Sequence, residues 1–160
     1  MSKAWILDLG HGRRAAVGER EQFHLMYDAV PVSVALAPVY CRHILIWDNK
    51  PMPAIDLGVW MDGRPAQTDA SYLGVYGYRE GVEADAPVHF GALWLSTPPR
   101  RVEVEESAAI PAPTGAGTLH TLALAWFAHE GNPVAIVDLA RVFARPLATA
   151  TARTAQSLSY

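Results

Sequence analysis

The fold of this chain is decided by residues 37–57, which read APVYCRHILIWDNKPMPAIDL. The run Arg42–Trp47 is rich in β-branched and aromatic side chains, which favour strands. It ends at Asp48-Asn49-Lys50-Pro51, a composition typical of a turn, and a second apolar run follows over Met52–Leu57. The stretch therefore predicts a β-hairpin whose second strand ends in Asp56-Leu57.

The hairpin pattern occurs a second time near the end of the chain. Residues 133–139 read PVAIVDL, against PMPAIDL at 51–57. Each of these prolines follows a polar turn, Asp48-Asn49-Lys50 in one case and Glu130-Gly131-Asn132 in the other. We interpret the two segments as the closing hairpins of two similar β lobes, with a chance similarity over seven positions as the alternative.

The composition favours many short strands over long helices. The chain has 160 residues, of which 51% are hydrophobic and 18% charged, so it is globular for most of its length. Its 12 glycines and 12 prolines would break a helical bundle repeatedly. Further strands are predicted at Trp5–Leu9, Arg14–Val17, Val30–Leu36, Tyr72–Tyr78, His89–Ser96, Val102–Val104, Leu119–Phe127 and Pro133–Val137. Pro31 limits Val30–Leu36 to an edge strand or an irregular connection.

Two segments are less regular. Glu19–Tyr27 fits a short helix or a strand, and Leu139–Ala144 predicts a terminal helical turn. Residues 145–160 are rich in Ala, Thr and Ser without periodicity, which predicts a disordered tail after a domain that covers residues 1–144.

The charge and the cysteine count exclude several classes of protein. A net charge of −3 argues against a nucleic-acid binder, which usually carries a basic patch. One cysteine cannot form an internal disulfide, and Asp8 interrupts the N-terminal apolar run before a signal peptide could form. No run approaches the length of a spanning helix. We therefore expect a cytoplasmic protein without membrane insertion.

The stretch from Ala37 to Leu57 resembles the signature of CheW-like domains. Its strongest match is Pro53 and Asp56-Leu57 at the family's distance from Ala37-Pro38, and the run from Leu122 to Leu139 is similar to the family's closing hairpin. The resemblance extends from Trp5 to Ala144. It implies an all-β fold of two five-stranded SH3-like barrels with a hydrophobic seam between them and a short terminal helix.

The resemblance also implies a function without catalysis. Members of the family are adaptors that couple chemoreceptors to the histidine kinase CheA. The implied partners are the CheW-like regulatory domain of a CheA-type kinase and the tip of a methyl-accepting chemoreceptor, with self-association or association with other CheW-like domains as a further option. No enzyme activity, cofactor, metal or nucleic acid is implied.

Three departures from the family pattern locate the expected partner surface. His43 replaces a glycine, Asp48-Asn49 replaces an Arg-Gly pair, and no acid occurs in Phe23-His24-Leu25-Met26, where the family carries one. Since opposite charges at an interface set partner choice, the changes favour a divergent array, such as one that controls type IV pilus twitching motility. The partner-binding residues that we predict are Arg42, His43, Asp48, Asn49 and Lys50.

Other readings of the chemistry-bearing residues stay open. A degenerate paralogue that acts as an array scaffold without kinase coupling is one alternative. A small β-barrel enzyme or ligand-binding protein that uses Cys41 and His43 is another; in a strand these two would share a face, although a buried structural cysteine is favoured. The acidic run Glu103, Glu105 and Glu106 fits either an exposed edge strand or a contact with a basic partner.

Overall fold

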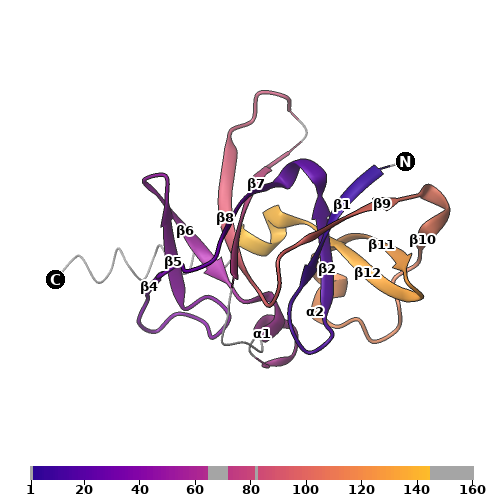
Figure 1. Ribbon diagram of the computed structural model, residues 1–160, viewed down its shortest axis with the longest axis horizontal. Helices are drawn as coiled ribbons and strands as arrows, with labels where there is room; N and C mark the ends of the chain where they lie inside the picture. The colour runs from indigo at the N-terminus through magenta and orange to yellow at the C-terminus, as the bar shows by residue number, and fades with distance from the viewer. Residues whose placement is uncertain (1, 65–71, 82, 145–160) are drawn as a thin grey trace.

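The computed structural model describes residues 2–64, 72–81 and 83–144, which form two six-stranded sheets (Figure 1). Residues 65–71 and the predicted disordered tail at 145–160 lie outside these ranges. The first lobe contains β1 (Ser2–Asp8), β2 (Arg14–Gly18), β9 (Arg100–Val104), β10 (Ala109–Ile110), β11 (Ala123–His129) and β12 (Asn132–Val137), in the order β10-β11-β12-β2-β1-β9. The second lobe contains β3 (Gln22–Met26), β4 (Val32–Ser33), β5 (His43–Trp47), β6 (Lys50–Ile55), β7 (Tyr72–Arg79) and β8 (Val88–Leu95), in the order β3-β7-β8-β6-β5-β4.

Each sheet has five longer strands and one strand of two residues, β10 or β4. The all-β class and the two barrels are thus confirmed, with a short sixth strand added to each. The strands β3 and β5 lie far apart in the order of the second sheet. The His24 ring of β3 nevertheless stacks on the Trp47 ring of β5, with 5.8 Å between the centroids, which shows that this sheet curls on itself.

The two lobes share one plan. In each, a hairpin (β5–β6 or β11–β12) is joined by parallel pairing to a second antiparallel pair (β7–β8 or β1–β2). The parallel registers correspond, with Ala54 opposite Ala92 in the second lobe and Ile136 opposite Ala16 in the first. The repeat of residues 51–57 and 133–139 is therefore structural, and the beginning of the chain completes the lobe that its last strands build.

Both hairpins turn through two residues in the left-handed region. Asp48 and Asn49 have φ of 51° and 58°, and Glu130 and Gly131 have φ of 52° and 79°. Two consecutive positive φ values define the type I′ turn, which favours Asn, Asp and Gly. Asp48-Asn49 therefore keeps the turn geometry while its charge differs from that of the family's Arg-Gly.

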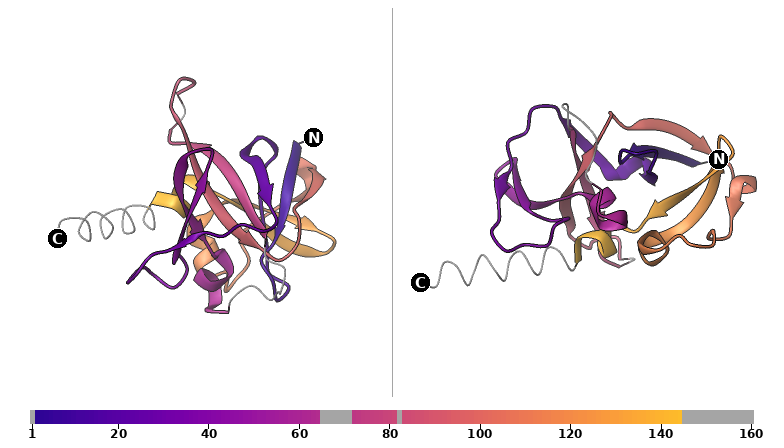
Figure 2. Two further views of the ribbon diagram at one scale, coloured as in Figure 1. Left: turned by 60° about the vertical axis from the view of Figure 1, so that its left-hand side comes forward. Right: turned by 90° about the horizontal axis from the view of Figure 1, so that it is seen from below.

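The aspartate after each hairpin starts a helix. Asp56 caps α1 (Leu57–Asp62) by accepting a hydrogen bond from the Val59 N–H over 3.0 Å. Asp138 accepts from the Ala140 N–H over 3.1 Å, and residues 139–144 are helical, as predicted. Figure 2 shows this terminal turn, in yellow, and α1 between the two lobes.

The largest apolar cluster lies between the lobes, as the resemblance implied. Its fully buried members come from both sheets and from the terminal turn, and they include Leu7, Val17, Ile55, Tyr76, Leu93, Val137 and Phe143. Each barrel also has a smaller interior cluster: Ala4, Ile6, Ala16, Phe127 and Val134 in the first lobe, and Leu45, Met52, Ala54, Leu73, Val75 and Ala92 in the second.

Some predicted elements differ from the structure. The strand expected over Leu119–Phe127 begins as the helix α2 (Thr118–Leu122), because Leu119 and Leu122 are spaced to bury one helical face in the seam. Within Val30–Leu36 only Val32–Ser33 forms a strand, and this strand lies at the edge of its sheet, as Pro31 predicts; the segment turns at Leu36, which has a φ of 60°. Glu19–Tyr27 divides into a 3₁₀ turn, η1 (Glu19–Glu21), and β3. None of the helices in the described ranges has the length and hydropathy that crossing a membrane requires.

Candidate protein-docking surface

The strand β5 separates the predicted partner-binding residues onto two faces. Leu45 is buried in the interior cluster of the second lobe, and the His43 ring lies 5.8 Å from the Trp94 ring, edge to face. Because side chains alternate along a strand, Ile44 and Ile46 point the other way, and Ile46 is 60% exposed. His43 therefore faces the barrel interior, half-buried, whereas the exposed Arg42 lies at the start of the outer face.

Apolar neighbours extend this outer face across three strands. Val32 of β4 lies opposite Ile44, and Pro51 of β6 lies opposite Ile46. Val32 is 56% exposed and Pro51 is also exposed. We call Val32, Ile44, Ile46 and Pro51 the apolar strip. It lies on the same sheet face as Ile55, which is buried in the seam. Among the residues that the structure describes, no other element covers the part of this face that the strip forms.

The connections on either side of β4 add further exposed apolar side chains. Val30 is 91% exposed, Leu36 85% and Val39 58%. A strand over Val30–Leu36 with one buried face would bury these two side chains, so the sequence pattern does not predict their exposure. Apolar side chains that are exposed in a group are a signal of a protein-binding surface.

The turn of the β5–β6 hairpin holds its charges in place. The Lys50 ammonium lies 3.7 Å from the Asp48 carboxylate and 4.7 Å from the centre of the Phe90 ring. Both contacts are exposed, so each contributes little stability, but together they restrict where the ammonium points. Asp48, Asn49 and Lys50 are all exposed at the end of the apolar strip opposite Arg42.

A cluster of aromatic rings fills the barrel end beneath this turn. Phe90 contacts Phe23 at 5.2 Å and Trp47 at 5.7 Å between ring centres, and His24 stacks on Trp47. Phe23 and His24 occupy the segment in which the family resemblance places an acid. Where the family has an acid, this chain therefore has rings that close the barrel end and pack beneath the hairpin turn.

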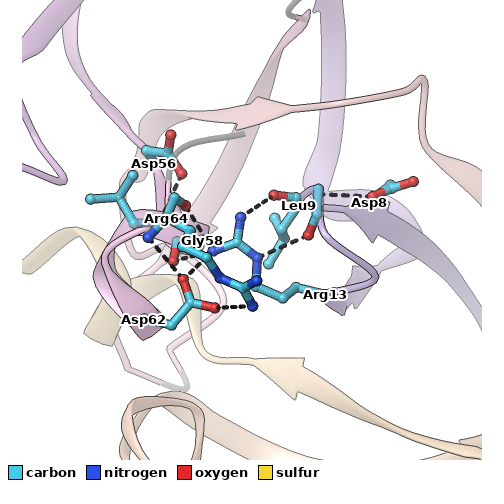
Figure 3. Close-up of polar contacts among 9 residues, drawn as sticks. Asp8, Leu9, Arg13, Asp56, Gly58, Asp62 and Arg64 are labelled. Atoms are coloured by element: carbon cyan, nitrogen blue, oxygen red, sulfur yellow. Dashed lines mark hydrogen bonds and ion pairs between the residues drawn. The ribbon is translucent and has the colours of Figure 1, made fainter. Parts of the chain in front are cut away.

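One buried arginine joins the two lobes (Figure 3). Arg13, in the β1–β2 turn of the first lobe, donates from Nε to the Gly10 carbonyl over 2.9 Å and from Nη2 to the Leu9 carbonyl over 3.0 Å. Its Nη1 donates to the Gly58 carbonyl and to Asp62 Oδ1 of α1, over 2.5 and 2.6 Å, and to the Arg64 carbonyl over 2.9 Å.

This arginine fixes the orientation of the apolar strip relative to the first lobe, because α1 follows β6 directly. Arg13 was not among the sequence candidates, since arginines are mostly exposed and no pattern marks a buried one. On the other side of the contact, Arg64 donates from its backbone N–H and its side chain to Asp62. These bonds, together with the charge of Arg13, lower the pKa of the Asp62 carboxyl.

Cys41 and His43 do not form a reactive pair. Cys41 precedes β5 in a turn where its N–H donates to the Pro38 carbonyl, so the prediction that the two share a strand face is wrong. The thiol is buried in the cluster between the lobes, and burial raises the pKa of Cys41 to about 11. Within the residues that the structure describes, no three His, Cys, Asp or Glu side chains are grouped to hold a metal ion.

Comparisons with known proteins show which known fold this structure resembles. No family model matches the chain, and no curated protein matches it in sequence. The structure is similar to the crystal structure of the scaffolding protein TtCheW from Thermoanaerobacter tengcongensis, with a TM-score of 0.68. The match covers 86% of this chain and 90% of that chain at 13% sequence identity. The chain therefore has the fold of a CheW-like domain, as the sequence resemblance predicted.

Proposed function

We propose that this CheW-like chain is a non-catalytic adaptor that couples chemoreceptors to a CheA-type histidine kinase. The likeness of its fold to a CheW scaffolding protein supports this role. The observation that carries the proposal is the apolar strip at the edge of the second lobe, which is exposed although its sheet face is otherwise buried.

The strip has the layout of a docking surface. Its centre is apolar, through Val32 and Ile46, and its ends are charged, through Arg42 at one end of β5 and Asp48 and Lys50 at the other. A strand of this length separates the two ends by about 20 Å, which matches a modest protein interface. Apolar burial at the centre supplies affinity, and the end charges select the partner.

The partner that we propose for this surface is the CheW-like regulatory domain of a CheA-type kinase in the cytoplasm, with the tip of a methyl-accepting receptor as the second partner of the adaptor. Asp48 in place of the family's arginine favours a kinase from a divergent array, such as a type IV pilus system, because the charge at the turn is reversed. Association with other CheW-like domains would use the same layout of charges.

Titration calorimetry with the regulatory domain of a CheA-type kinase from the same genome tests the proposal. Ile46→Asp should weaken binding at least about tenfold, because it places a charge at the apolar centre. Leu124→Asp is the matched control, since Leu124 is 65% exposed on β11 of the first lobe. Asp48→Asn, which removes the charge and keeps a residue that the left-handed turn favours, should change affinity without changing the melting temperature. Failure of the unmodified chain to bind any such kinase domain would overturn the proposal.

A degenerate paralogue that scaffolds an array without kinase coupling is the second candidate, and the same reversed charge at Asp48 favours it. The two candidates differ in one measurement. The scaffold should bind other CheW-like domains and not the kinase domain, and Ile46→Asp should abolish that association.

A further inference from the structure

The first lobe contains an apolar pocket of about 290 Å³ that the proposed adaptor role does not use. It lies where the barrel interior of that lobe opens to solvent. Ala4, Gly18, Val104, Ala125, Phe127 and Ile136 contribute to its lining. Ala125 is exposed although its partner in the ladder, Ile136, faces the interior cluster of the barrel. The barrel is therefore open at this end because its interior is incompletely filled.

The second lobe shows what fills the equivalent space. Leu73 of β7 lies opposite Trp94 of β8, and in the first lobe the corresponding pair is Ala4 opposite Gly18. His43 lies opposite Ala54 in the second lobe, and Ala125 lies opposite Ile136 in the first.

The pocket thus occupies the place of three larger side chains. In the second lobe the Trp94 indole packs edge to face with the His43 imidazole, with 5.8 Å between the ring centres. In the first lobe both ring positions are held by Gly18 and Ala125, and the leucine position is held by Ala4. The internal comparison therefore identifies an aromatic ring as the group that this geometry accommodates.

The rim of the pocket is acidic on one side. Glu105 and Glu106 both line it and are exposed, and Glu105 accepts a hydrogen bond from the Ser107 hydroxyl over 3.3 Å. Lys3 lies at the rim as well, so the two glutamates leave a net negative charge there. These two glutamates belong to the acidic run for which the sequence allows two interpretations, an exposed edge strand or a contact with a basic partner.

We propose that this pocket binds the aromatic side chain, of tryptophan type, of a protein segment whose neighbouring residue is Lys or Arg. A volume of about 290 Å³ suits a single side chain and is at the lower limit for a whole cofactor. The ring replaces the missing indole, and the basic neighbour pairs with Glu105 and Glu106. The site lies on the first lobe, so it is independent of the kinase docking proposed for the second.

The peptide acetyl-Lys-Trp-Lys-amide, titrated into ¹⁵N-labelled protein, tests the proposal. Saturable amide shifts are expected around Ala4, Gly18 and Ala125. Ala125→Trp should fill the pocket and weaken binding at least about tenfold. Ala128→Trp is the matched control, because Ala128 is exposed on the same strand and does not line the pocket. If Ala125→Trp lowers the melting temperature, Ala4→Leu, which restores the residue found at Leu73, is the second variant.

The rim is tested separately. Glu105→Gln should weaken binding of the same peptide about two- to fivefold, whereas Glu103→Gln, which removes an acid of β9 that does not line the pocket, should leave it unchanged. Acetyl-Glu-Trp-Glu-amide should bind more weakly than the lysine peptide. Absence of saturable shifts, shifts that survive both filling variants, or equal affinity for the two peptides would overturn the proposal. Binding of the kinase domain should be unchanged in Ala125→Trp, so the two proposals can fail separately.

Discussion

The guanidinium of Arg13 donates a hydrogen bond to the carboxylate of Asp62 over 2.6 Å, and this contact joins the first lobe to the second. The side chain of Arg13 is only 7% exposed and that of Asp62 is 32% exposed. The carbonyls of Leu9, Gly10 and Gly58 accept the remaining buried donors. A charge so enclosed is tolerated because all of its donor groups have acceptors.

Replacing Arg13 should therefore be severe. Arg13→Ala leaves buried carbonyls without donors and should lower the free energy of unfolding by at least about 3 kcal/mol, measured by urea denaturation. Arg14→Ala is the control, since Arg14 is exposed and reaches Glu130 only at 3.7 Å; it should cost less than about 1 kcal/mol. Similar losses for the two variants would show that Arg13 does not hold the lobes together.

The approach of Arg13 to the backbone of α1 requires a glycine. A Cβ at Gly58 would lie 2.7 Å from the Arg13 Cζ, and the guanidinium is held by hydrogen bonds on both sides. Gly58→Ala should thus destabilise by about 1–2 kcal/mol, although alanine gains about 1 kcal/mol in helix propensity.

Gly77→Ala is the comparison for this variant. The added Cβ would meet the ring of Phe23, which is half-exposed and is held by packing against Phe90 rather than by hydrogen bonds, so the ring can shift toward solvent. The cost by thermal melting should be less than about 1 kcal/mol. A larger loss at position 77 than at 58 would contradict the account of Arg13 as an immovable neighbour.

The Asp62 contact gives the stability a dependence on acid. Hydrogen bonds from Arg64 and the charge of Arg13 lower the pKa of Asp62 in the folded state below its ordinary value of 3.8. The stabilisation is therefore complete above that ordinary value and is lost as the pH falls through the lower, folded-state pKa. Below about pH 4, urea midpoints of the unmodified chain should fall more steeply than those of Asp62→Asn. Parallel pH profiles would contradict this, and Asp85→Asn, in the β7–β8 loop, controls for the loss of one negative charge.

The thiol of Cys41 should be inert in the folded protein. Burial raises the pKa of Cys41 to about 11, so almost no thiolate is present at pH 8, and the sulfur lies in the cluster between the lobes. Iodoacetamide at pH 8 should label the chain in urea and not in buffer alone. Rapid labelling of the native protein would instead favour the reading of Cys41 as a catalytic residue.

Much of the fold could be predicted from local sequence patterns. Asp48-Asn49 and Glu130-Gly131 predict tight turns, and Asp56 and Asp138 recur at the same distance after them, so both hairpins could be read from the sequence. The strand expected at Leu119 was wrong because Leu119 and Leu122 lie three residues apart. That spacing places them on one face of a helical turn but on opposite faces of a strand, and both are buried in the same cluster between the lobes.

The site was less accessible to sequence reasoning. The exposure of Arg42 and of the turn from Asp48 to Lys50 agrees with a surface role, but partner binding by them remains a prediction, and His43 faces inward. The strand of Ile46 lies next to the two-residue edge strand β4, which pairs only with His43 and Ile44, and this pairing order cannot be read from the sequence. The network around Arg13 joins residues far apart in the chain, and no local pattern encodes it.

The two barrels have the same strand arrangement, but different side chains fill the end of each barrel at which its hairpin turns. Trp47 and Phe90 fill this end of the second barrel, while the corresponding positions of the first hold His129 and Arg14. There Arg100 contacts His129 at 3.2 Å and Glu130 at 3.4 Å. The same backbone therefore supports an aromatic closure in one lobe and an ionic closure in the other.

The parallel pairing of Ala15 with Ala135 has a consequence for how the protein is made. A ribosome releases β1 and β2 first, but their partner β12 emerges only after every other strand. The strands of the second lobe, β3–β8, are consecutive in the chain, so this lobe can fold before the remaining strands of the first lobe have been synthesised. Such long-range closure is slow, and the early hairpin meanwhile presents an unpaired edge to any other nascent chain. Synthesis order thus makes the N-terminal hairpin the segment most in need of chaperone protection.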